Sequence, residues 1–301
     1  MTAPTLVERR TTTDQISEPR IGFWQRTKTR RLVGNVVLYT VLIVLAVLFL
    51  VPFYLMVRNA FMLNREITAF EWQWVPNPIQ WGNVTKLFED GTMMTGLRNS
   101  ALIAIVNLVF QTFFASMAGY ALARIAVPGR KAVFGFMLTT LMIPGAVTFV
   151  PTYAVVSYLG GVNTLWGIVV PGLFNVFATF LFRQFYLDFP IEIEEAGRVD
   201  GAGYYRTFFG LALPNSYGIM AALGALSFIG SWNAFLWPLV IGQEESTWTV
   251  QRVLSSFLTA QTIDLSQLFM AAMVGAAPLV IVFLVMQRFI VQGVAMTGIK
   301  G

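Results

Sequence analysis

A stretch of 51 residues without a charged side chain, residues 132–182, constrains the fold most. One helix that crosses a bilayer needs only about 20 apolar residues, so this stretch is long enough for two. A turn cluster at residues 160–164, Gly-Gly-Val-Asn-Thr, divides it and predicts spans at residues 132–153 and 165–186. Pro144 and Pro151 are expected to kink the first span, where the freed carbonyls need neighbouring helices or a water-filled path.

Four further apolar segments predict spans at residues 32–57, 99–123, 216–241 and 268–290. The chain is 56% hydrophobic and only 12% charged, whereas a soluble domain carries about twice that charged share. The expected fold class is therefore an all-α integral membrane protein with six transmembrane helices, in a domain of residues 32–301. Residues 1–31 are polar and basic, and we expect a mostly disordered cytoplasmic tail.

The distribution of basic residues predicts the orientation. With the N-terminus inside, three quarters of the 20 Lys and Arg residues lie on the cytoplasmic side of the six spans. This bias predicts that both termini and residues 187–215 are cytoplasmic in a multi-pass membrane protein. The net charge of +5 is thus interpreted as topology and not as nucleic-acid binding, because the basic residues flank apolar runs.

The residues that are missing exclude several kinds of chemistry. The chain has no Cys and no His, so it cannot form a disulfide, a thiolate zinc site or a Ser-His pair. It has no G-x-x-x-x-G-K-[ST] phosphate loop, and its predicted spans hold no acidic or basic residue away from their ends. We therefore predict no catalytic residue, metal ligand or cofactor on this chain.

Residues 187–215 form a polar interruption between the fourth and fifth spans. The pattern predicts a helix over residues 191–199 with three acidic residues near its N-terminus, a turn at residues 200–203, and a second helix from Tyr204 to Pro214. On the second helix the expected apolar face consists of Tyr204, Tyr205, Phe208, Phe209 and Ala212, opposite Arg206, Thr207 and Gly210. So small a pair of helices cannot build its own core, which favours a docking surface.

This segment closely resembles the EAA loop of permease subunits from binding-protein-dependent ABC importers. The matching residues are Glu195, Ala196, Gly197, Asp200, Gly201, Ala202, Leu213 and Pro214, with Gly197 in place of the usual second alanine. Residues 119–124, Gly-Tyr-Ala-Leu-Ala-Arg, followed by Val-Pro-Gly at 127–129, match the same family. Residues 232–238 and 278–301 look like its carbohydrate branch, most like the six-span permease of maltose systems, and the resemblance covers nearly the whole chain after the tail.

The resemblance implies a bacterial cytoplasmic-membrane subunit that forms half of a translocation pathway in the lipid bilayer. The implied partners are a second permease subunit, two ATP-binding subunits that hold ATP and Mg²⁺ and dock on the EAA loop, and an extracytoplasmic solute-binding protein. The implied solute is a sugar or oligosaccharide. Similar subunits import glycerol-phosphate or amino-sugar solutes, and a self-sufficient facilitator, or a membrane enzyme or assembly factor, remains an alternative from another class.

Neutral polar residues in the spans are the candidates for the path of the solute. They are Asn107, Gln111, Asn175, Trp232 and Asn233. Uncharged hydrogen-bonding groups beside aromatic rings suit a polyhydroxylated solute. The alternative for any one of them is a hydrogen bond between helices, which stabilises the bundle by about 1 kcal/mol.

Overall fold

The computed structural model describes residues 23–259 and 263–298, and every regular element in these ranges is a helix. The prediction of an all-α protein is confirmed for these residues. The chain divides into two units, Met1–Tyr54 and Leu55–Gly301, and each is described by itself.

The α-helices are α1 (Phe23–Ala60), α2 (Asn64–Ile67), α3 (Gly82–Phe88), α4 (Thr92–Val106), α5 (Thr112–Arg124), α6 (Arg130–Thr140), α7 (Gly145–Tyr158), α8 (Leu165–Val169), α9 (Val176–Asp188), α10 (Ile191–Val199), α11 (Tyr204–Thr207), α12 (Leu213–Asn215), α13 (Tyr217–Trp232), α14 (Leu236–Ile241), α15 (Val250–Thr259) and α16 (Leu265–Gly298). Two π-helices, η1 (Asn107–Gln111) and η3 (Phe208–Ala212), and two 3-10 helices, η2 (Val170–Gly172) and η4 (Glu245–Thr247), complete the described elements.

The first unit contains most of α1. Residues 32–54 of this helix are almost entirely apolar, on every side of the helix. A helix that is apolar all round needs a nonaqueous surrounding, which a bilayer supplies. The predicted first span therefore lies within α1.

Within the described residues, three continuous helices are long and apolar enough to cross a membrane: Leu32–Ala60, Thr92–Arg124 and Leu265–Gln287. The second of these joins α4, η1 and α5, so it begins seven residues before the predicted span at 99–123. Arg98, the residue before the predicted span, therefore lies inside α4. The number of candidate spans rises to six if each of three bent helix pairs counts as one.

The predicted third span lies over α6 and α7, which meet at an angle of 99°. The break ends at Pro144, one of the two predicted kink sites, whereas Pro151 lies inside α7. The predicted fourth span falls on α8, η2 and α9, with a bend of 42° between Gly172 and Val176. Both regions are thus broken helices and not straight rods.

The predicted fifth span, residues 216–241, is not one helix. Helix α13 ends at Trp232, and α14 begins at Leu236. Pro238 explains the break, because its ring has no N–H for the carbonyl of Ala234 and clashes with that carbonyl in a continuous helix. The prediction of a single helix over this range was wrong.

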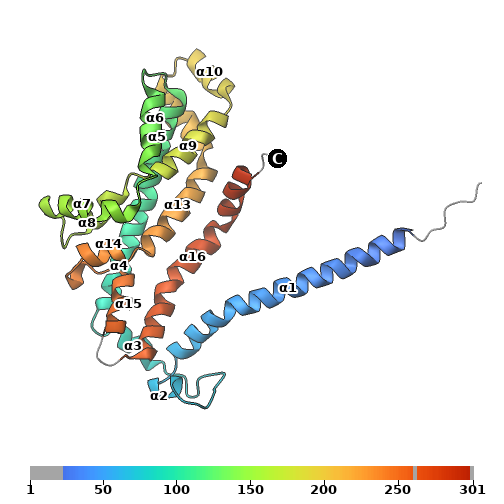
Figure 1. Ribbon diagram of the computed structural model, residues 1–301, viewed down its shortest axis with the longest axis vertical. Coiled ribbons are helices and arrows are strands. Elements are labelled where there is room, and N and C mark those ends of the chain that lie inside the picture. Colours follow the sequence, from blue (N-terminus) through green and yellow to red (C-terminus); the bar gives the residue numbers. More distant parts are fainter. Residues whose placement is uncertain (1–22, 260–262, 299–301) are drawn as a thin grey trace, which may run out of the picture. The chain divides into compact units, whose positions relative to one another are not determined.

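Three apolar clusters form the core of the second unit. One joins α4, α13, α15 and α16, and another joins α4, α7, α8 and α14. The third lies between α5, α9, α13 and η3, and its largest buried side chains include Tyr120, Phe182, Tyr186 and Phe208. In the second unit, α10 lies at the end beside this third cluster, and α3 lies at the opposite end (Figure 1). The third cluster therefore supports the predicted docking segment.

Candidate functional site: the α9–α13 segment and the span interior

The segment between α9 and α13 has the local structure that its sequence predicts. Helix α10 covers Ile191–Val199, the range that we predicted, and α11 starts at Tyr204. Pro190 precedes the first turn of α10 in an extended conformation, with φ −56° and ψ 122°. It therefore directs the chain into the helix without removing a donor that the helix needs.

Gly201 forms the tip of the segment. Its φ is 77°, a left-handed conformation that favours glycine, and a side chain there would meet open space. The Gly201 amide donates to the carbonyl of Arg198 at 3.0 Å, and the Ala202 amide donates to Gly197 at 2.9 Å. This pair of bonds is the Schellman arrangement that ends a helix, so the Asp-Gly-Ala sequence has a physical reason here.

Gly197 lies where α10 approaches η3. A Cβ at this position would lie 2.8 Å from Leu211 Cδ1 and 3.9 Å from Ala202 Cβ. The glycine that departs from the family pattern therefore allows a closer approach between the two helical parts of the segment.

The second helical part differs from its predicted amphipathic pattern. Phe208 and Ala212 are buried as expected, but Thr207, which we placed on the opposite face, is buried too. Tyr205 is 82% exposed, although we placed it on the apolar face. The wider turn of the π-helix η3 shifts the register, and a pattern with 3.6 residues per turn cannot anticipate that shift.

The surface of the segment presents most of the motif. Glu195, Ala196 and Asp200 are exposed, and so are two large apolar side chains near the tip, Val199 at 88% and Tyr205 at 82%. Leu213 and Pro214 lie in α12, where the chain turns into α13. An apolar tip beside exposed carboxylates suits contact with another protein.

One acidic residue of α10 is fully buried, and the sequence analysis missed this. Glu194 has no exposed surface, and its Oε1 lies 3.0 Å from Arg124 Nε at the end of α5. Arg198 Nη2 lies 3.9 Å from Glu194 Oε2, and the Tyr120 hydroxyl donates to the same oxygen at 3.5 Å. The spacing of Glu194 and Arg198, one helical turn apart, is the only local signal for this cluster; Arg124 is distant in sequence.

Two of the candidate path residues lie in the π-helix η1. Asn107 is buried, and its Nδ2 donates to Ser231 Oγ on α13 at 2.9 Å. Gln111 donates from Nε2 to the carbonyl of Gly172 at 2.6 Å, beside the break before α9. Both side chains thus bond another helical segment at a π-turn, a feature that often accompanies functional sites.

Trp232 and Asn233 differ in their surroundings, although they are adjacent. Trp232 is 2% exposed, and its Nε1 donates to the Gly275 carbonyl on α16 at 3.0 Å. Asn233 is exposed and accepts a hydrogen bond from Gln251 Nε2 at 3.3 Å. The structure therefore places Trp232 inside the helix packing and Asn233 on the surface of the described chain.

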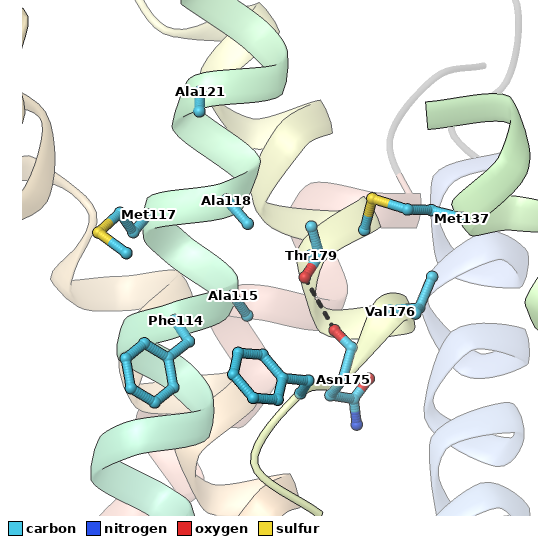
Figure 2. Close-up of a pocket in the computed structure, with 10 residues that line it drawn as sticks. Phe114, Ala115, Met117, Ala118, Ala121, Met137, Asn175, Val176 and Thr179 are labelled. Carbon is cyan, nitrogen blue, oxygen red and sulfur yellow. Dashed lines mark hydrogen bonds between the residues drawn. The ribbon is translucent and has the colours of Figure 1, made fainter. Parts of the chain in front are cut away.

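Asn175 caps the N-terminus of α9 and lines a pocket. Its Oδ1 accepts the Ala178 amide at 2.9 Å, and its backbone carbonyl accepts the Thr179 hydroxyl at 2.9 Å. The pocket has a volume of about 280 Å³ and is predominantly apolar, with residues from α5, α6 and α9 around it (Figure 2). Asn175 thus caps α9 and also lies at a cavity that an apolar group could fill.

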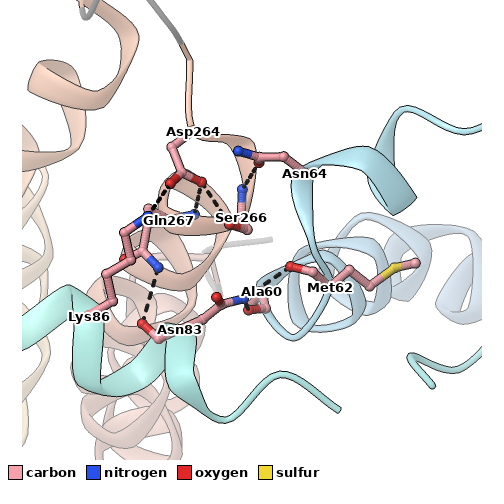
Figure 3. Close-up of polar contacts among 8 residues, drawn as sticks. All are labelled: Ala60, Met62, Asn64, Asn83, Lys86, Asp264, Ser266 and Gln267. Atoms are coloured by element: carbon pink, nitrogen blue, oxygen red, sulfur yellow. Dashed lines mark hydrogen bonds and ion pairs between the residues drawn. The ribbon is translucent and has the colours of Figure 1, made fainter. Parts of the chain in front are cut away.

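A polar network lies at the end of the second unit opposite α10 (Figure 3). Asp264 forms an ion pair with Lys86 at 2.7 Å and accepts bonds from Ser266 Oγ at 2.7 Å and the Gln267 amide at 3.2 Å. Burial alone would raise the pKa of the Asp264 carboxyl, but the bonds from Lys86, Ser266 and Gln267 outweigh it and lower the pKa to about 2. Asn83 donates to the carbonyls of Ala60 and Met62 at 2.9 and 3.0 Å. The network ties α3 and the residues after α1 to the start of α16.

Comparison with known proteins identifies the family. The model of the family described as binding-protein-dependent transport system inner membrane component matches residues 111–296. The arabinooligosaccharides transport system permease protein AraQ of Halalkalibacterium halodurans is 34% identical over 227 residues, which are 75% of this chain and 81% of the relative. The sn-glycerol-3-phosphate transport system permease protein UgpE of Pectobacterium atrosepticum is 33% identical over 258 residues, which are 83% of this chain and 91% of the relative.

A solved structure shows the same fold. It is a crystal structure of a bacterial ABC transporter involved in the import of the acidic polysaccharide alginate, with a TM-score of 0.77 at 19% identity. The match covers 90% of this chain and 99% of the chain in that structure. The resemblance to ABC importer permeases is thus confirmed, as is a multi-pass protein of the inner membrane. The chain belongs to the family of inner membrane components of binding-protein-dependent transport systems.

Proposed function

We propose that this chain is a permease subunit of an ATP-driven importer for a sugar or oligosaccharide. It forms half of the translocation pathway with a second permease subunit. An external solute-binding protein delivers the solute, and two ATP-binding subunits on the cytoplasmic side supply the energy.

The proposal rests on the tip of the α9–α13 segment. The Schellman turn at Gly201 presents exposed Val199 and Tyr205 beside exposed Glu195 and Asp200. Exposure of this apolar surface to water is unfavourable, and an ATPase that covers the surface removes that exposure. We therefore assign the docking of the ATPase to this segment, in the orientation that the positive-inside bias predicts.

The choice of a sugar depends on charge. A phosphorylated solute needs cations along its path, whereas every cation of the described candidate spans, Arg98 included, lies within two turns of a helix end. Neutral side chains such as Asn107 and Gln111 suit hydroxyl groups better. The names of relatives such as UgpE support sn-glycerol-3-phosphate as the second candidate solute.

A matched pair of glycine substitutions tests the docking role. Gly201 and Gly160 have φ values of 77° and 76°, and an added Cβ meets nothing within 4 Å at either position. Valine imposes a similar backbone strain at both, about 1–2 kcal/mol or more, but only Gly201 lies at the proposed contact.

The complex is purified with its partner ATPase, and uptake of a labelled arabinooligosaccharide and of labelled sn-glycerol-3-phosphate is measured in proteoliposomes. We expect Gly201→Val to insert normally, but to lose uptake and to retain less of the ATPase. Gly160→Val is expected to retain the ATPase. Equal retention of the ATPase and equal uptake in the two variants would refute docking at Gly201. Transport by the chain alone, without ATP, would favour the facilitator.

A further inference from the structure

Glu194 differs from the other acidic residues of α10. Glu192 and Glu195 are exposed, whereas Glu194 has no exposed surface. A buried carboxylate is unfavourable unless cations and hydrogen-bond donors compensate it, so its partners determine what the burial achieves.

The principal partner comes from another helix. Arg124 is the last residue of α5, its side chain is 12% exposed, and its Nε lies 3.0 Å from Glu194 Oε1. Arg124 also donates from Nη2 to the backbone carbonyl of Phe189, two residues before α10. One guanidinium therefore holds both the first turn of α10 and the chain that enters it.

Helix α5 is itself fixed to its neighbours at this level. Gly119 allows such a close approach that an added Cβ would lie 2.6 Å from Phe182 Cβ on α9. The Tyr186 hydroxyl lies 2.7 Å from Ser116 Oγ on α5 and donates to Ser216 Oγ, just before α13, at 3.2 Å. The ends of α5, α9 and α13 thus form one packed block, to which Arg124 belongs.

We propose that Glu194 and Arg124 are positioning residues that transmit displacement of the docking segment to α5. The inference rests on the proposed function, in which an ATPase moves this segment. Glu195 faces outward to the partner, and Glu194 faces inward to α5. Without the buried pair, α10 could move on its own, because the turn at residues 200–203 and the Phe189–Pro190 linker would absorb the displacement.

The test uses a variant that removes both charges. A single substitution leaves the other charge buried, whereas the double variant Glu194→Gln with Arg124→Met keeps the volume and leaves no uncompensated ion. Its folding should resemble that of the parent. Glu192→Gln is the matched control, since it makes the same change at an exposed position on the same helix.

The first measurement concerns geometry and requires no solute or ATPase. The chain contains no Cys, so spin labels can be attached at Ala126→Cys, just after α5, and at Val199→Cys on α10. In the full chain in nanodiscs we expect a narrow distance distribution, which broadens in the double variant and not in Glu192→Gln. An unchanged distribution in the double variant would overturn the inference.

The second measurement concerns coupling in the assembled complex. We expect the double variant to retain its ATPase and to hydrolyse ATP, but to take up roughly tenfold less labelled arabinooligosaccharide per ATP than the parent. Normal uptake per ATP would also overturn the inference. If the parent chain itself retains no ATPase, the proposed function fails, and the spin-label result still decides whether the pair fixes α10.

Discussion

The close contact between α5 and α9 makes a specific prediction for Gly119. Ala115, Gly119 and Ala123 lie four residues apart on one face of α5, and all three are buried. Small residues at this spacing let two membrane helices approach until their backbones touch. A Cβ on Gly119 would lie 2.8 Å from the amide nitrogen of Arg183 and 3.0 Å from the carbonyl carbon of Phe182.

The expected change in the free energy of unfolding follows from two opposing effects. Alanine stabilises a helix by up to about 1 kcal/mol relative to glycine. Overpacking costs about 1–3 kcal/mol, and the upper end applies to Gly119 because two of the three nearest atoms belong to the backbone. We therefore expect Gly119→Ala to destabilise the protein by about 2 kcal/mol, which lowers the melting temperature by about 4–8 °C.

Gly135 in α6 is the control, because a Cβ there meets nothing within 4 Å. Gly135→Ala gains the helix propensity without the clash, so its melting temperature should stay the same or rise by about 2–4 °C. Thermal unfolding in detergent, followed by far-ultraviolet circular dichroism, measures both variants. A melting temperature for Gly119→Ala at or above that of the parent would show that α5 and α9 can separate without cost.

Three further predictions concern the polar network and the topology. Because the folded-state pKa of Asp264 lies below its usual value near 3.8, its ionised form stabilises the fold above that pH, and this stabilisation is lost as the pH falls toward about 2. The difference in melting temperature between the parent and Asp264→Asn should therefore shrink from pH 6 to pH 3; a constant difference would contradict the ion pair. Asn83→Ala should cost about 1–3 kcal/mol in unfolding free energy, since two buried carbonyls lose their donor; an unchanged denaturation midpoint would contradict this. In intact cells an impermeant maleimide should label Glu245→Cys and not Lys131→Cys; the reverse would invert the predicted orientation.

Local sequence signals predicted the local structure of the α9–α13 segment well. Pro190 and the Asp-Gly-Ala sequence act within a few residues of themselves, so the bounds of α10 and the turn at Gly201 could be predicted from the sequence. The break before α7 was predictable for the same reason, because Pro144 precedes it. Its angle of 99° was not, since it depends on how α7 packs against α8 and α14.

Contacts between distant residues could not be predicted in this way. Glu194 and Arg124 are 70 positions apart, and an acidic residue in the first turn of a helix is ordinarily exposed. The π-helices η1 and η3 also escaped prediction, because no residue type marks them and they depend on neighbouring packing. The error at Thr207 follows from η3.

The candidate path residues differ in which of their side-chain donors and acceptors remain without a hydrogen bond. Trp232 uses its single donor on Gly275, and Asn175 uses its side-chain oxygen to cap α9, so each has a structural role that needs no solute. Asn107 binds Ser231 through Nδ2, while its buried Oδ1 has no protein donor among the described residues. An unsatisfied acceptor at a π-turn costs free energy that a hydroxyl group or a water molecule could recover. Among these three, Asn107 is therefore the residue whose contacts the packing of the described chain explains least, and we keep it as a proposed contact of the solute path.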